Sequence, residues 1–109
     1  MDIELKKKEI EYKFQELYNT YLTDINEMIE SKSYTNVIFQ MTPFTARRLR
    51  LINEMGYYIQ NLIQEFFEQN VPLKDAEQLY ILCRNLEVDN YNKANEDEVK
   101  CYNIIYGSV

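Results

Sequence analysis

The sequence predicts an all-α protein, a small helical bundle in which a long antiparallel helical hairpin packs with two shorter helices. Apolar residues recur at gaps of three and four over two long stretches, 2–32 and 42–70, as they do along one side of an α-helix. Only two Gly and two Pro interrupt 109 residues, which favours long helices over many strands and turns. A chain of this length suits one domain, so we expect residues 1–109 to form a single helical domain.

The first helix is expected from Asp2 to about Lys32. Acidic residues near its start and Lys32 at its end complement the helix dipole. Its inner face is expected to contain Ile3, Ile10, Phe14, Leu17, Tyr21, Ile25 and Met28. A second apolar row indicates contact with more than one neighbouring helix and contains Tyr18, Leu22, Ile25 and Ile29.

Three consecutive lysines, Lys6 to Lys8, lie within this first helix. Glu4 and Lys8 are four residues apart, as are Glu9 and Lys13, and opposite charges at this spacing pair on an exposed helix surface. We therefore interpret the lysine run as a solvated helix face.

Residues 33–41, SYTNVIFQM, are the ambiguous part of the sequence. Val37, Ile38 and Phe39 favour a strand, but the chain offers no second strand to pair with it. We expect a connection that places Val37 or Phe39 in the core. Pairing of this segment with its copy across a dimer is the alternative.

The central helix is expected from Thr42 to Asn70. The Thr42 hydroxyl can cap the first free amides, and Pro43 suits the first helical position because the missing N–H is no loss there. Pro72 ends the helix soon after Asn70, since proline clashes with a preceding helical turn. The expected core face comprises Ala46, Leu49, Ile52, Gly56, Ile59, Ile63 and Phe66, widened by Met55, Leu62 and Phe67.

Two shorter helices are expected to follow. The first runs from Pro72 to about Leu86 and turns inward Ala76, Leu79, Leu82, Cys83 and Leu86. Residues 87–94, EVDNYNKA, are predicted to form a loop, because Asn and Asp side chains compete with helical hydrogen bonds. Asn95 and Glu98 have the spacing of a capping box and open a last helix that Gly107 ends. The inner residues of that helix are expected to be Val99, Tyr102, Ile105 and Tyr106.

The two shorter helices are too short to cover the long pair, so a homodimer that shares the long helices is favoured over a monomer. The composition, rich in Ile, Asn, Lys, Tyr and Glu, suits an AT-rich genome such as that of a low-GC bacterium, its phage or a parasite. The start of the chain lacks the layout of a secretion signal, so we expect a cytoplasmic protein. Cys83 and Cys101 are expected to be buried thiols rather than a disulfide.

The residues offer little for catalysis or for a bound cofactor. The chain has no His, which removes the commonest general base and metal ligand. Neither cysteine has a base beside it in sequence. Around Asp89 the spacing of an EF-hand calcium loop fails, because Tyr91, Lys93 and Lys100 stand where oxygen ligands are required. We therefore expect that the protein is not an enzyme and that it binds no cofactor and no metal ion.

Two clusters on the central helix are candidates for binding a partner. Arg47, Arg48 and Arg50 oppose the helix dipole near its positive end and are suited to grip carboxylates or phosphates. The alternative is that Arg50 pairs with Glu54 and that Arg47 and Arg48 pair with acids of the first helix.

Tyr57 and Tyr58 are the second cluster. They point about 100° apart on the helix, so they do not both point to the centre of one stripe. Tyrosine is enriched at protein interfaces, and Tyr12, Tyr18 and Tyr80 belong to the same possible surface. The alternative for each ring is that it fills the core.

The favoured function is a non-enzymatic protein-binding module that acts as an inhibitor, adaptor or regulator of a partner protein through an acidic helical surface. A phage or mobile-element product that blocks a host protein is one concrete version. The alternative is a dimeric nucleic-acid-binding regulator that uses the arginine cluster and the lysine run. The net charge of −6 works against it, because the field of the whole chain repels nucleic acid and anionic membranes.

Overall fold

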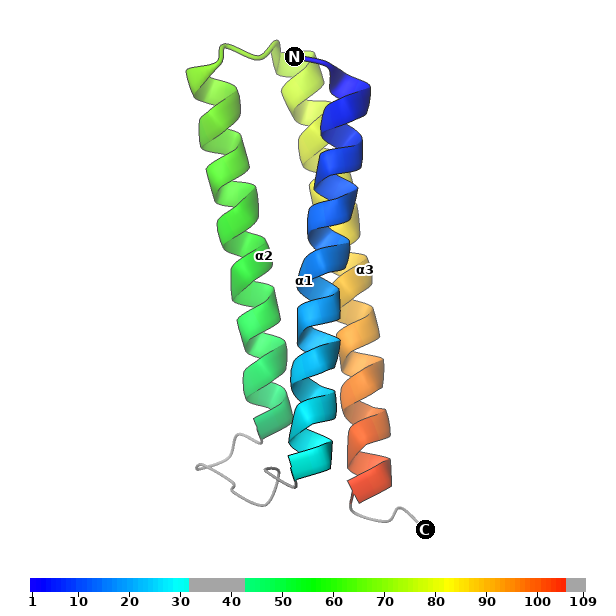
Figure 1. The fold of residues 1–109 in the computed structure, drawn as a ribbon. Coiled ribbons are helices and arrows are strands. Elements are labelled where there is room, and N and C mark those ends of the chain that lie inside the picture. Colours follow the sequence, from blue (N-terminus) through cyan, green and yellow to red (C-terminus); the bar gives the residue numbers. More distant parts are fainter. Residues whose placement is uncertain (32–42, 106–109) are drawn as a thin grey trace.

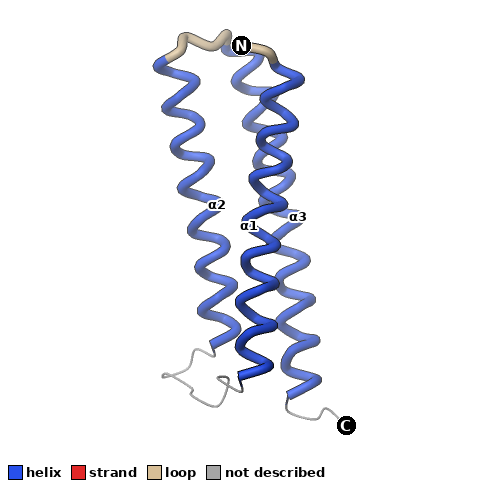
Figure 2. The backbone as a smooth tube through the Cα atoms, viewed as in Figure 1, coloured by secondary structure: helices blue, strands red, loops and turns tan. Residues whose placement is uncertain are grey.

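The computed structural model describes residues 1–31 and 43–105, and it confirms the all-α fold as a helical bundle (Figure 1). Helix α1 comprises Ile3–Ser31, α2 comprises Pro43–Glu68, and α3 comprises Leu73–Ile105. Helices account for nearly all of these two ranges, which contain no strand (Figure 2). The bundle is elongated and measures 53 × 23 × 19 Å.

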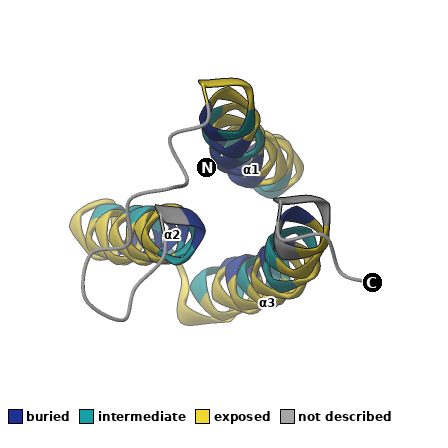
Figure 3. Ribbon diagram, turned by 90° about the horizontal axis from the view of Figure 1, so that it is seen from below, coloured by how far each residue is buried: buried dark blue, intermediate teal, exposed yellow. Residues whose placement is uncertain are grey.

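The chain direction alternates from helix to helix. Helices α1 and α2 are antiparallel, as expected, and α3 runs back parallel to α1 (Figure 1). Lys6 near the start of α1 accordingly contacts Glu65 near the end of α2. Viewed along the bundle, the three helices form a triangle whose buried residues point inward (Figure 3).

Helix α1 matches its predicted limits and its predicted inner face. The Asp2 carboxylate accepts a hydrogen bond from the Leu5 amide at 3.2 Å, which caps the first turn. Ile3 is half-buried. The buried apolar side chains are Ile10, Phe14, Leu17, Tyr18, Tyr21, Ile25 and Met28.

Helix α2 begins at Pro43, as predicted, whereas Thr42 and the segment 33–41 lie outside the described residues. Its end is a Schellman motif. Asn70 adopts a left-handed conformation with φ 53°, and the Val71 amide donates to the Phe66 carbonyl at 3.0 Å. Asparagine tolerates this conformation better than most residues, which explains why the helix stops there.

The predicted core face of α2 was only partly right. Ile59, Phe66, Met55 and Leu62 are buried, but Leu49, Ile63 and Phe67 are exposed, as are Ala46 and Gly56. The helix carries two overlapping apolar rows, and the row that faces both α1 and α3 is the one that is buried. Besides the four residues just named, that row contains Phe44 and Leu51.

Helix α3 corrects the predictions for the last third of the chain. A loop at 87–94 and a capping box at Asn95 were expected, but a single helix runs through both. Asn90 is buried, and its side-chain amide donates to the Phe14 carbonyl at 3.1 Å, so it does not compete for the backbone of its own helix. Ala94 is fully buried against the other helices. Tertiary packing thus overrides the local turn preference of this segment.

The inner face of the first half of α3 matches expectation, because Leu79 and Cys83 are buried and Ala76, Leu82 and Leu86 pack against the core. Val99, which was expected to face inward, is 59% exposed. Tyr106 and Gly107 lie outside the described residues, and so do the side chains of Tyr102 and Ile105.

Candidate functional site

Arg48 joins α2 to α3. Its Nε donates to Glu98 at 2.5 Å, and both side chains are largely buried. The Thr45 hydroxyl donates to the other Glu98 oxygen at 2.6 Å, and the guanidinium lies 6.0 Å from the centre of the Tyr91 ring. The alternative in which Arg48 pairs with an acid of the first helix is wrong about the helix, because Glu98 of α3 supplies the carboxylate.

The other two arginines do not share the surroundings of Arg48. Arg50 pairs with Glu54 at 3.1 Å, the intrahelical contact expected from the sequence. Arg47 is exposed beside a small surface depression between α1 and α2 that Asp24 also lines, and it forms no ion pair with any residue of the described ranges. The three arginines therefore do not share one environment, because Glu98 holds Arg48 whereas Arg47 and Arg50 both line the surface depression.

Tyr57 and Tyr58 also separate. Tyr57 is 66% exposed on the outer side of α2. Tyr58 points toward α1, where its ring packs edge-on against Phe14 with centroids 5.7 Å apart. Its hydroxyl is buried without a hydrogen-bond partner among the described residues, and burial raises its pKa to about 12.

The remaining tyrosines of the expected surface divide in the same way. Tyr12 and Tyr80 are exposed, whereas Tyr18 is buried and donates a hydrogen bond to Asp97 of α3. Burial, reinforced by that hydrogen bond, raises the pKa of Tyr18 above its usual range. The neighbouring Tyr21 hydroxyl donates to the Ala94 carbonyl at 3.2 Å. Tyr18 and Tyr21 are thus core residues that tie α1 to α3.

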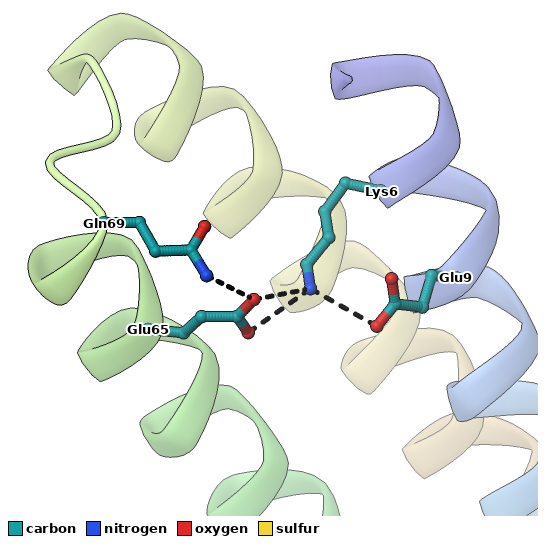
Figure 4. A network of polar contacts seen from close by, with 4 residues as sticks. All are labelled: Lys6, Glu9, Glu65 and Gln69. Atoms are coloured by element: carbon teal, nitrogen blue, oxygen red, sulfur yellow. Dashed lines mark hydrogen bonds and ion pairs between the residues drawn. The ribbon is translucent and has the colours of Figure 1, made fainter. Parts of the chain in front are cut away.

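A charged contact that the sequence did not predict lies at the other end of the bundle (Figure 4). Lys6 was assigned to a solvated face, but its side chain is only 9% exposed, and its ammonium donates to Glu65 at 3.1 Å and to Glu9 at 3.3 Å. Gln69 donates to the same Glu65 carboxylate. Burial alone would lower the pKa of Lys6, but the two carboxylates outweigh burial and raise it. The sequence did contain a signal for the burial of Lys6. Ile3 and Ile10 belong to the inward row, and Lys6 lies three residues after the first and four before the second, so it falls in the same row.

Removing the acid and removing the base of the Lys6–Glu65 ion pair are expected to change the free energy of unfolding by different amounts. Glu65→Leu is expected to lower the free energy of unfolding by about 1–3 kcal/mol, because it leaves the buried ammonium with Glu9 alone. Lys6→Met is expected to cost less than about 1 kcal/mol, because the remaining carboxylates are partly exposed and stay hydrated. Urea unfolding followed by circular dichroism measures both variants, and a larger loss for Lys6→Met contradicts this account.

A row of exposed apolar side chains follows α2 and α3. On α2, Leu49 lies one turn after Thr45 on the same side of the helix. The Thr45 hydroxyl donates a hydrogen bond to Glu98 of α3, so the α2 row that contains Leu49 borders α3. On α3, Tyr91 lies beside Arg48 of α2, and Tyr80 and Leu73 continue its side of the helix at whole-turn spacing. We call this surface the α2–α3 face and define it by Leu49, Ile63, Phe67, Leu73, Tyr80 and Tyr91.

Gly56 lies in the middle of the α2 row, seven residues from Leu49 and seven from Ile63. A glycine inside a helix costs about 1 kcal/mol relative to alanine. Among the described residues a Cβ at this position would meet nothing within 4 Å, so no contact within these ranges requires a residue without a side chain.

Both cysteines are buried free thiols, as expected. Burial raises the pKa of Cys83 to about 11 and raises that of Cys101 as well. A thiol with a raised pKa carries little thiolate at neutral pH, so neither has the character of a nucleophile.

Within residues 1–31 and 43–105, no group of three or more acidic or cysteine side chains is arranged to hold a metal ion. None of the helices, over the residues described, is long and apolar enough to cross a membrane. Comparison of the chain with protein-family models, with curated proteins and with solved structures returned no match.

Proposed function

We propose that this chain is a non-enzymatic protein-binding module that acts as an inhibitor, adaptor or regulator of a partner protein, with the α2–α3 face as its contact surface. The observation that supports the proposal is the exposure of large apolar side chains along that face, where Phe67 is 85% and Leu73 is 83% exposed. Burying such surface is favourable by roughly 25 cal/mol per Å². Contiguous exposed apolar patches mark interaction surfaces.

The form of the face indicates the kind of contact. Two neighbouring helices that carry exposed apolar residues at whole-turn spacing suit contact with the apolar side of another helix. A phage or mobile-element product that blocks a host protein is one concrete form of this proposal. The two buried thiols suit a reducing compartment such as the cytoplasm.

Affinity purification from the native organism, followed by mass spectrometry, tests the proposal with three tagged chains. The unmodified chain and Tyr12→Glu are expected to recover the same partner, and Ile63→Glu is expected to lose it. Tyr12→Glu is the matched control, because it places the same charge at an exposed residue on the outer side of α1. Equal recovery of the partner protein by all three chains would show that the contact surface lies outside the α2–α3 face.

A further inference from the structure

We infer that the α2–α3 face takes a second copy of this chain when the partner protein is absent, an inference that rests on the proposed role of this face as a protein-binding surface. The two copies are related by a twofold axis that passes beside Gly56. The two α2 helices therefore run antiparallel and approach each other most closely at that glycine.

The charge distribution favours an identical partner. The chain carries a net charge of −6, so two copies repel each other unless they meet through an uncharged surface. Residues 55–64 of α2 contain no charged side chain, although 28% of the chain is charged. An acidic or basic partner would find no complementary charge on this stretch, whereas a second copy meets it without like-charge repulsion.

The position of Gly56 in α2 indicates where the twofold axis passes. It stands near the midpoint of α2, which spans Pro43–Glu68, so an antiparallel pair centred there overlaps along the whole helix. Leu49 and Ile63 are each seven residues from it, and Leu49 of one copy then faces Ile63 of the other. A residue without a side chain at the centre lets the two backbones approach closely, which accounts for a glycine that no contact among residues 1–31 and 43–105 explains.

Helix α3 fits the same axis. The Asn90 amide nitrogen lies 3.7 Å from the Met55 sulfur, and α2 and α3 are antiparallel, so the level of Gly56 on α3 is close to Val88. Val88 is 52% exposed, and the twofold axis places it beside its own counterpart. Each helix of the face thus contributes an apolar or small residue at the centre of the contact.

Sedimentation equilibrium on the purified chain tests the inference. The unmodified chain is expected to have twice the 13.2 kDa mass of one copy. Gly56→Arg is expected to weaken the dimer about 100-fold or more, because it places two like charges opposite each other at the axis. The same substitution replaces glycine with a good helix former, so at a concentration at which both chains are monomeric the variant is expected to unfold at higher temperature. Tyr12→Arg is the control that leaves the dimer intact.

Oxidation of cysteine variants tests the geometry. Gly56→Cys is expected to form a disulfide-linked dimer, and an equimolar mixture of Leu49→Cys and Ile63→Cys is expected to form the mixed dimer in preference to either like pair. The native cysteines are buried, so the unmodified chain is the blank. A dimer that persists in Gly56→Arg, or linked like pairs of Leu49→Cys alone, overturns the inference. A strict monomer at high concentration also overturns it, whereas the proposed function would fail only if Ile63→Glu still recovered the native partner.

Discussion

Above about pH 10 the protein is expected to lose stability steeply, because unfolding then releases protons that the folded chain retains on buried tyrosines. Burial raises the pKa of Tyr58 to about 12. Burial likewise raises the pKa of Tyr21, and burial with the Asp97 hydrogen bond raises that of Tyr18. Each raised pKa means that the folded state holds its proton more tightly than the unfolded state does.

The pH window follows from the sign of these shifts. Below about pH 10, the unfolded-state pKa of tyrosine, both states are protonated and stability does not depend on these groups. Between that value and the folded-state pKa, each tyrosine reduces the free energy of unfolding by about 1.4 kcal/mol per pH unit. Three tyrosines together remove about 4 kcal/mol per pH unit, against a typical total of about 5–15 kcal/mol. Burial also raises the pKa of Cys83, to about 11. Its contribution to the loss of stability therefore begins at a lower pH, at the ordinary pKa of a thiol.

Far-ultraviolet circular dichroism and tyrosinate absorbance, recorded together during an alkaline titration, measure this loss. Tyr58→Phe is expected to change stability little at neutral pH, because its hydroxyl lacks a hydrogen-bond partner among the described residues, yet to reduce the alkaline slope by about 1.4 kcal/mol per pH unit. Tyr57→Phe, which alters an exposed ring, is the control. The prediction fails if Tyr58→Phe leaves the slope unchanged.

Phe14→Ala is expected to reduce the free energy of unfolding by about 3–5 kcal/mol, the range for removing a buried phenylalanine. Phe14 is 1% exposed, its ring packs against Tyr58 of α2, and its carbonyl accepts the Asn90 hydrogen bond from α3. The substitution therefore opens a cavity at a point where all three helices meet.

Urea unfolding of the variant measures this effect. Tyr12→Ala is the matched control, because it removes an aromatic ring from the same helix at a position that is 71% exposed, and it is expected to change stability by less than about 0.5 kcal/mol. Equal losses for the two variants would place Phe14 outside the core.

The sequence was sufficient where one helix face is continuously apolar and its ends have chemical signals. Helix α1 has an almost unbroken row, and Pro43 and Asn70 mark the ends of α2. The sequence was insufficient in α3, because the buried row passes through Asn90, which favours a turn in sequence and is accommodated in the helix by its hydrogen bond to the Phe14 carbonyl.

The candidate site was harder to predict because its contacts are distant in sequence. The residue that neutralises Arg48 is 50 positions away, and no local spacing identifies it. On α2 the periodicity predicted one broad apolar face, and which part of that face is buried depends on where α1 and α3 pack. The exposed row is therefore visible as a surface only after the fold is known.

The buried polar contacts have a consequence for how the helices are aligned lengthwise. Lys6 with Glu65, Asn90 with the Phe14 carbonyl, and Tyr18 with Asp97 occupy successive levels of the bundle. Apolar side chains alone would tolerate sliding one helix by a turn, about 5.4 Å. Sliding α1 would separate all three donors from their acceptors, sliding α2 would separate Lys6 from Glu65, and sliding α3 would break the other two contacts. In a low-dielectric interior an unmatched polar group is costly. These contacts therefore select one vertical alignment of the three helices from several that would bury similar apolar area.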